Sequence, residues 1–224
     1  MKKINIAIDG PAGAGKSTVA RLLASRLGYV YIDTGAMYRA LAWKALQRKV
    51  DPKNGPALLS LLKEIEIRLL PTERGNQVFV NDTDVTTDIR SNEVTAIVSK
   101  ISQHQEVRTS MVERQQQLAR HKGTVLDGRD IGTAVLPEAE LKIFLLATVE
   151  ERAKRRHEEN CQKGIPSDYA SILEDIKQRD ELDTTRTFSP LVKAKDAIEM
   201  DTTNMSIAEV VERMYELAME RIRS

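Results

Sequence analysis

Residues 10–17 read GPAGAGKS and fit the pattern G-x-x-x-x-G-K-[ST] of a phosphate-binding loop. Glycine lets the backbone of such a loop turn tightly and present its N–H groups to phosphate oxygens, which a Cβ would obstruct. Lys16 is expected to reach the β- and γ-phosphates of a nucleotide, and the Ser17 hydroxyl is expected to bind Mg²⁺. This segment, called the P-loop below, therefore predicts an α/β fold that binds a nucleotide.

The segments on both sides of the P-loop have the hydrophobic patterns of a strand and a helix. Residues 4–8 form an apolar run that stops at the loop, as a buried parallel strand does. From Ser17, apolar residues recur at helical spacing up to Gly28, which stands where a helix C-cap glycine belongs. Strands that alternate with helices form a parallel sheet covered on both faces, with functional groups at the carboxyl ends of the strands. The sequence thus predicts a five-stranded parallel sheet flanked by helices, with the other strands over 29–32, 124–126, 141–146 and 197–200.

A segment of about 90 residues separates the second predicted strand from the third, which is far more than one crossover helix requires. Val78 and Val80 precede the turn-forming pair Asn81-Asp82 and predict a small hairpin, whereas the apolar spacing over 96–118 predicts two helices. We therefore expect a single domain over 1–224, consisting of a core at 1–60 and 101–224, an inserted subdomain at about 61–100 and a short lid at about 152–165.

The charge balance disfavours a general attraction to polyanions. The chain has 34 basic and 33 acidic residues, a formal charge of +1, and only 4% aromatic residues. Such a protein has no overall positive electrostatic field to attract nucleic acid or an anionic membrane, and it has few aromatic side chains on which bases could stack. We expect no nucleic-acid partner and no membrane partner, so any anion must be bound locally.

The single cysteine points to a reducing compartment. The single cysteine, Cys161, excludes an internal disulfide and a cysteine zinc cluster, and three histidines disfavour a histidine-rich metal site. The apolar stretch after Met1-Lys2-Lys3 is interrupted by Asp9, too early for a signal peptide, and no run of about 18 apolar residues could span a membrane. We expect a cytoplasmic protein, and a monomer because the sequence has no exposed apolar stripe.

Arginines are spread through segments that we expect at strand ends and in loops, and they point to a phosphate acceptor. A hydroxyl acceptor must lose a proton during transfer, whereas a phosphate acceptor is already an anionic nucleophile and needs positive clamps instead of a base. The planar arginine fork suits this task because it binds phosphate oxygens in pairs and stays charged. An Asn-Lys-x-Asp segment, which GTPases use to read guanine, does not occur. The arginines concerned are Arg39, Arg108, Arg129, Arg152, Arg155, Arg156, Arg179 and Arg186.

Four motifs together resemble the bacterial cytidylate kinase family, over essentially the whole chain. They are GPAGAGKST at 10–18, DTGAMYR at 33–39, LDGRDIGT at 126–133 and RDELDTTR at 179–186. The P-loop alone would indicate only the superfamily, whereas the combination is specific. The resemblance implies a P-loop kinase fold with its inserted subdomain on the nucleoside monophosphate side. It also implies a phosphotransferase of pyrimidine nucleotide metabolism that uses ATP and Mg²⁺ to convert CMP or dCMP to the diphosphate.

The resemblance further implies that Asp130 and Arg108, with Ser99, read cytosine. Cytosine presents a 4-amino donor beside the N3 and O2 acceptors, so an accepting aspartate and a donating arginine or hydroxyl complement it. Uracil has a carbonyl in place of the amine, and this carbonyl would leave the aspartate facing another acceptor. Unpaired buried groups of this kind give strong rejection of the wrong base.

The remaining site residues follow from the same resemblance. Arginines near the acceptor are expected to bind phosphate groups, Asp183 to bind the pentose hydroxyls, and Thr34 to belong to the same pocket. The predicted catalytic residues are Lys16, Arg129, Arg179 and Arg186. The predicted CMP-binding residues are Asp33, Thr34, Arg39, Ser99, Arg108, Arg129, Asp130, Arg179, Asp183 and Arg186. The predicted ATP-binding residues are Gly10, Pro11, Ala12, Gly13, Ala14, Gly15, Lys16, Ser17, Thr18, Arg152 and Arg156, with Ser17 as the metal ligand.

Several alternatives stay open at this point. Asp127 either binds Mg²⁺ through water, as a Walker-B acid does, or fixes the Arg129 loop. A kinase of another small acceptor, such as UMP, AMP or shikimate, would share the fold. A nucleotide-dependent switch is an alternative from another class, but a switch has no use for a second anion pocket. By fold analogy the site is expected to close only with both nucleotides bound, with the inserted subdomain and the segment 155–164 as moving parts.

Overall fold

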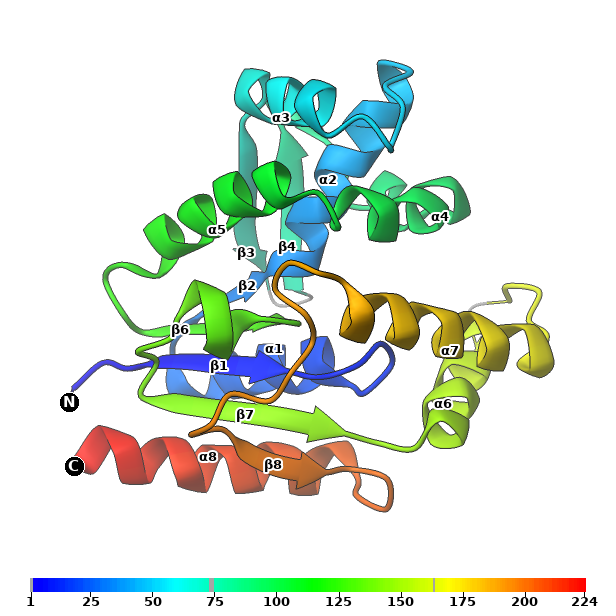
Figure 1. Ribbon diagram of the computed structural model, residues 1–224. Helices are drawn as coiled ribbons and strands as arrows, with labels where there is room; N and C mark the ends of the chain where they lie inside the picture. The colour runs from blue at the N-terminus through cyan, green and yellow to red at the C-terminus, as the bar shows by residue number, and fades with distance from the viewer. Residues whose placement is uncertain (1, 73–74, 163) are drawn as a thin grey trace.

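A computed structural model describes residues 2–72, 75–162 and 164–224, and its centre is a five-stranded sheet (Figure 1). The strand order is β2-β6-β1-β7-β8, and every neighbouring pair is parallel. This arrangement confirms the predicted fold class. The strands are β1 (Asn5–Asp9), β2 (Val30–Asp33), β6 (Thr124–Gly128), β7 (Leu141–Leu146) and β8 (Ile198–Asp201).

Helices cover both faces of this sheet because successive side chains of each buried strand point to opposite sides. On one face Ile6 and Ile8 of β1 belong to the same core cluster as buried residues of α1 (Lys16–Leu27) and α8 (Ile207–Arg223). On the other face Ala7 packs in a separate cluster that includes Ala119 and Ile131. Gly28 ends α1 in the left-handed conformation, with φ 65°, as predicted for a C-cap glycine. The sheet therefore has a hydrophobic core on both sides.

The chain between β2 and β6 forms a lobe above the sheet in Figure 1. It has its own core, to which helices and a small antiparallel sheet of order β3-β4-β5 contribute. The turn Asn81-Asp82 joins β4 to β5, so the hairpin occurs where the sequence predicts it. The elements are α2 (Thr34–Gln47), α3 (Gly55–Glu64), β3 (Ile67–Thr72), β4 (Gly75–Val80), β5 (Thr83–Asp84), a short 3-10 helix η1 (Asp88–Arg90), α4 (Asn92–Ile101) and α5 (Gln105–Ala119).

Buried residues of α2, α3 and α5 share the core of this lobe with the small sheet, so the packed unit is wider than the predicted subdomain at 61–100. Residues 73 and 74 of that range lie outside the described residues. The domain boundary itself remains a prediction.

Two helices, α6 (Val149–Gln162) and α7 (Tyr169–Thr185), form an arm beside the carboxyl ends of the strands (Figure 1). The predicted lid at 152–165 falls on α6 and the turn after it, and residue 163 of that range lies outside the described residues. A short π-helical turn, η2 (Ile131–Val135), begins three residues after the end of β6. The arm, the lobe and the P-loop thus meet at one edge of the sheet.

No helix within the described ranges combines the length and the apolar character that crossing a bilayer requires.

Candidate active site

The P-loop connects β1 to α1 and has the backbone geometry that only glycine allows at two positions. A Cβ on Gly10 would lie 2.2 Å from the carbonyl oxygen of Leu145, well inside van der Waals contact. Gly15, the N-cap of α1, has a left-handed φ of 82°, which L side chains rarely adopt. The loop therefore wraps the start of α1, where backbone N–H groups and the helix dipole favour an anion.

Lys16 is only 5% exposed, and its Nζ donates to the carbonyl oxygen of Pro11 at 2.7 Å. Burial lowers the pKa of Lys16 far below its ordinary value, and the charge of Arg129 lowers it further while Asp127 opposes the shift. A buried ammonium in this setting gains strongly from an anionic partner. Lys16 is thus placed to hold a phosphate group.

Asp127, near the end of β6, contacts the P-loop serine. Its Oδ2 accepts from Ser17 Oγ at 2.8 Å, and its Oδ1 accepts from the Tyr31 hydroxyl at 2.8 Å. Burial raises the pKa of Asp127 to about 6, and the nearby charge of Asp33 adds to the rise. The carboxylate therefore lies next to the hydroxyl predicted to bind Mg²⁺.

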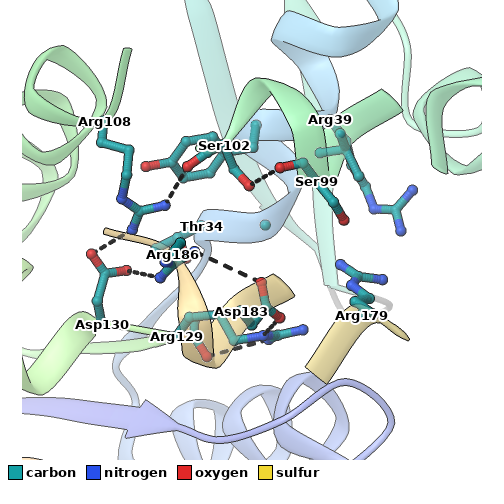
Figure 2. A pocket seen from close by; sticks show the side chains of 14 residues that line it. Thr34, Arg39, Ser99, Ser102, Arg108, Arg129, Asp130, Arg179, Asp183 and Arg186 are labelled. Carbon is teal, nitrogen blue, oxygen red and sulfur yellow. Dashed lines mark hydrogen bonds and ion pairs between the residues drawn. The ribbon is translucent and has the colours of Figure 1, made fainter. Parts of the chain in front are cut away.

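A pocket separate from the P-loop lies between the lobe and the arm (Figure 2). All the predicted CMP-binding residues except Asp33 line this pocket. Asp33 instead caps α2, accepting from the backbone N–H of Ala36 at 2.9 Å, and its Oδ2 lies 3.6 Å from Arg90 Nη2. The lining residues are Thr34, Gly35, Tyr38, Arg39, Val98, Ser99, Ser102, Arg108, Gly128, Arg129, Asp130, Arg179, Asp183 and Arg186.

Asp130 and Arg108 form a buried ion pair in this pocket (Figure 2). Arg108 is 2% exposed, and its Nη2 lies 2.5 Å from Asp130 Oδ2, while its Nη1 donates to the carbonyl oxygen of Ser102 at 3.0 Å. Arg186 Nη2 lies 3.9 Å from the other oxygen, Asp130 Oδ1. Arg108 Nε and the Tyr38 hydroxyl are buried without a hydrogen-bond partner in the described part of the chain. Such unpaired donors cost free energy, so the pocket is suited to a polar ligand.

Asp183, on α7, joins two of the arginines. Its Oδ2 accepts from Arg129 Nε at 2.8 Å, and its Oδ1 lies 3.7 Å from Arg186 Nη1. Burial alone would raise the pKa of Asp183, but the charge and hydrogen bond of Arg129 lower it below its ordinary value. Asp183 is therefore an ionised acceptor between two guanidinium groups.

The arginines in the pocket lie close enough to lower one another's pKa. Burial lowers the pKa of Arg179 to about 10, and the charges of Arg129 and Arg39 add to the fall. Burial also lowers the pKa of Arg39 to about 10, with the charges of Arg90 and Arg156 acting in the same direction. Arg179 Nε is buried without a hydrogen-bond partner among the described residues. A group of mutually repelling cations attracts an anion, which removes the repulsion.

The elements that carry these arginines differ from the expectation of strand ends and loops. Arg39 lies on α2, Arg108 on α5 and Arg179 on α7, and Arg152, Arg155 and Arg156 lie on α6. Only Arg129 directly follows a strand, and Arg186 is the C-cap of α7. The expectation was wrong for most of them because helices of the lobe and arm, and not the strand ends alone, surround the pocket.

Arg152, predicted to bind ATP, is buried and contacts the P-loop backbone. Its Nη1 donates to the carbonyl oxygen of Ala12 at 2.9 Å, and its Nη2 lies 2.6 Å from Asp180 Oδ2. Arg156, one turn further along α6, is exposed and lies 3.7 Å from Glu159. The direct ATP contacts of both arginines remain predictions.

Five pocket-lining residues were missed by the sequence analysis: Gly35, Tyr38, Val98, Ser102 and Gly128. Helical spacing offered a signal for two of them. Tyr38 lies four residues after Thr34 on α2, and Ser102 lies three residues after Ser99 at the end of α4, so each shares a face with a predicted residue.

A P-loop that faces a separate, arginine-lined pocket defines a P-loop kinase with a small anionic acceptor. A family model described as cytidylate kinase matches residues 6–220. The chain is 59% identical to a cytidylate kinase of Geobacillus sp. (strain WCH70), with 98% of both chains covered. It is 55% identical to a cytidylate kinase of Bacillus subtilis (strain 168), with 99% of both chains covered. The chain therefore belongs to the cytidylate kinase family.

A solved structure supports the fold alone. The chain matches an uncharacterized protein from Eubacterium ventriosum ATCC 27560 with a TM-score of 0.52 and 15% identity, over 98% of this chain and 99% of the other.

Proposed function

We propose that this protein transfers the γ-phosphoryl group of ATP to the 5′-phosphate of CMP or dCMP, giving ADP and CDP or dCDP. Membership of the cytidylate kinase family supports this reaction. The observation that carries the proposal is the Asp130–Arg108 pair, which lies buried in a pocket lined with arginines beside the P-loop. A base reader and a phosphate clamp in one pocket are what a nucleoside monophosphate requires.

The P-loop is the proposed donor site. Its backbone N–H groups would surround the phosphates of ATP, and Lys16 would exchange its contact with the Pro11 carbonyl for the β- and γ-phosphates. The phosphate charge would offset the burial that lowers the pKa of Lys16, so the lysine stays protonated during transfer.

Base selection is assigned to Asp130 and Arg108, with Ser99 nearby. The carboxylate of Asp130 would accept from the 4-amino group of cytosine, and Arg108 would donate to the ring acceptors. The carbonyl that uracil has in this place would face the carboxylate and lose that hydrogen bond, which is the basis of strong discrimination. Asp183, held by Arg129 and Arg186, is the proposed acceptor for the pentose hydroxyls.

Phosphate clamping is assigned to Arg39, Arg129, Arg179 and Arg186. A monophosphate needs no base to become a nucleophile, so the chemical task is to bring two anions together and neutralise the charge on the transferred group. The mutual repulsion of these arginines would be relieved by the bound phosphates. Arginines in such a role contribute powers of ten in rate.

The P-loop and Asp127 also fit a magnesium ion. Ser17 Oγ and Asp127 Oδ2 lie 2.8 Å apart and supply the hard oxygen atoms that Mg²⁺ prefers, with Asp127 acting through water. Mg²⁺ held there with ATP would supply positive charge that offsets the negative charge developing on the phosphates during transfer. Tyr31, which donates to the other oxygen of Asp127, would keep the carboxylate oriented.

ATP and CMP or dCMP are the proposed partners of a cytoplasmic monomer. Among the described residues, most of the large apolar side chains that are exposed lie on different elements, such as Leu46 on α2, Leu118 on α5 and Ile207 on α8, which supports a monomer. Light scattering on the purified protein tests this, because a dimer would double the measured mass.

A coupled assay of ADP release with a panel of acceptors tests the reaction. We expect turnover with CMP and dCMP and little with UMP, AMP or shikimate. A rate that is highest with another acceptor would replace CMP as the substrate. ATP hydrolysis that does not respond to any acceptor would favour a nucleotide-dependent switch.

A further inference from the structure

Asp9, the last residue of β1, is a buried carboxylate that the proposed function leaves without a role. Asp9 comes directly before the P-loop in the chain and is 4% exposed. Its Oδ1 accepts from the backbone N–H of Ile131 at 2.8 Å, and its Oδ2 accepts from that of Gly132 at 2.7 Å. Both oxygens are thus used by two consecutive residues that lie far away in the sequence.

These two N–H groups are the first of the turn η2. The first N–H groups of a helical turn have no partner within it and need an outside acceptor. An aspartate at the N-cap usually supplies this acceptor with its own side chain. The N-cap here is Asp130, yet its side chain makes no capping hydrogen bond and pairs with Arg108 instead. Asp9 therefore caps η2 in place of Asp130, whose carboxylate pairs with Arg108 in the pocket.

The packing around Asp9 leaves this loop little freedom. Asp9 lies opposite Gly128 in the register of β1 and β6, so the loop after β6 starts beside it. A Cβ on Gly132 would lie 3.4 Å from Asp9 Oδ2 and 3.2 Å from Lys142 Cδ. Burial raises the pKa of Asp9 to about 6 in spite of its two backbone hydrogen bonds. An apolar residue at this position would avoid the unfavourable burial of a charged carboxylate, but it would leave the N–H groups of Ile131 and Gly132 unpaired.

We propose that Asp9 is a positioning residue for base selection, because it holds the backbone of Ile131 and Gly132 so that the Asp130 carboxylate faces the acceptor pocket. This inference rests on the proposed function, in which Asp130 reads cytosine. It also gives the strand before the P-loop a second task, since the same residue leads into the donor site and supports the acceptor site.

Two variants of the full-length protein remove one or both of the acceptor oxygens that Asp9 offers to Ile131 and Gly132. Asp9→Asn keeps the shape but offers one acceptor oxygen, and Asp9→Ala offers none. We expect the ratio of kcat/KM for CMP to that for UMP to fall about tenfold in Asp9→Asn, and further in Asp9→Ala. The loss should appear as a higher KM for CMP, whereas the KM for ATP stays near the wild-type value because the two oxygens of Asp9 accept from the turn η2.

A double-mutant cycle and a stability control separate positioning from general loosening. If Asp9 acts through Asp130, then Asp9→Asn changes the ratio less than about twofold in an Asp130→Asn background. Met214→Ala removes a buried side chain of α8 in the sheet core, far from η2 in the chain, and should lower thermal stability without changing the ratio. If Asp9→Asn does not fold, Gly132→Ala, which adds a Cβ 3.4 Å from the same carboxylate and 3.2 Å from Lys142 Cδ, should shift the ratio in the same direction.

An unchanged CMP/UMP ratio in Asp9→Asn, with a wild-type protein that phosphorylates CMP, would overturn the role of Asp9 and leave the proposed function standing. An equal fall of the ratio in Met214→Ala would also overturn it. A wild-type protein without activity on CMP would reject the proposed function, and the role of Asp9 would fall with it.

Discussion

Lys16 is a buried cation, and its ammonium group donates a hydrogen bond to the neutral carbonyl of Pro11. We predict that Lys16→Ala lowers kcat by about 100- to 1000-fold, because one preorganised donor at the transferred group is worth that much. The folded state should not lose stability, since the variant removes a buried ammonium. ADP release and a thermal melt measure the two effects.

A surface lysine provides the matched control for that variant. Lys193 Nζ lies 2.8 Å from Glu199 on the surface, so Lys193→Ala makes the same change of composition away from the site. Its turnover should equal that of the wild type. Near-normal turnover of Lys16→Ala would contradict the assignment of the P-loop as the donor site.

Asp130 is the residue on which base selection depends in the proposed function. We predict that Asp130→Asn raises the KM for CMP and lowers the CMP/UMP ratio by at least about tenfold, because an amide can donate to the uracil carbonyl. The variant also leaves Arg108 buried without its ion pair, which costs about 3–5 kcal/mol of stability. Steady-state kinetics with both acceptors and a thermal melt test these effects.

Asp82→Asn serves as the control for Asp130→Asn, because Asp82 lies in the exposed turn after β4 and faces solvent. Both its melting temperature and its CMP/UMP ratio should match the wild type. A ratio that also stays constant in Asp130→Asn would remove Asp130 from base reading.

At the residue scale, the sequence predicts what is contiguous and misses what is brought together by folding. The P-loop can be recognised from the sequence because its glycines, Lys16 and Ser17 are close together in the chain. Asp33 shares a motif with Thr34, yet its side chain is used to cap α2 and does not line the pocket. Asp9 could not be found in advance, because its partners lie on a turn beyond a different strand.

At the element scale, the five strands of the main sheet are predictable because buried parallel strands are short, apolar and bounded by turns. The inserted segment is harder, since helical spacing shows that a helix has an apolar face but not which elements that face contacts. Its core joins residues from α2, α3 and α5 to the small sheet. For the same reason, the arginines on helices could not be placed from the sequence alone.

Helix α6 is tied to the P-loop through Arg152, and this contact carries a prediction of its own. We expect Arg152→Met to lower stability by about 1–3 kcal/mol, because it leaves the Ala12 carbonyl and Asp180 without their buried donor. The KM for ATP should rise as well, since the P-loop backbone loses an anchor. A thermal melt and kinetics at saturating CMP measure these effects.

Two further variants show what the contact of Arg152 does. Lys154→Met removes the same charge from an exposed position of α6 and should change neither stability nor the KM for ATP. Adding Asp180→Asn to Arg152→Met removes the unpaired carboxylate and should restore part of the stability without restoring the KM. A KM for ATP that stays normal in Arg152→Met would limit this arginine to a structural role.

At the scale of the whole molecule, the near balance of 34 basic and 33 acidic residues hides a local excess of positive charge. Arg39, Arg129 and Arg179 lie close together where the lobe, the sheet and the arm meet (Figure 2). Mononucleotides fit this distribution better than a polyanion does, because the positive field is confined to a pocket. The arrangement also means that two bound nucleotides would touch all three parts of the molecule.

This arrangement predicts that ATP and CMP stabilise the fold together more than they do separately. Each ligand alone at 100 times its Kd contributes about 2.7 kcal/mol, which corresponds to a rise in Tm of about 5–10 °C for a chain of this size. If the arm and lobe close only around both nucleotides, each ligand binds more tightly in the presence of the other, and the coupling adds to the sum. Thermal melts with a non-hydrolysable ATP analogue, with CMP and with both measure this coupling.

UMP in place of CMP is the control and should give a smaller joint effect, since it lacks the amine from which Asp130 would accept a hydrogen bond. A joint shift equal to the sum of the separate shifts would show that the two sites are independent and that closure does not couple them.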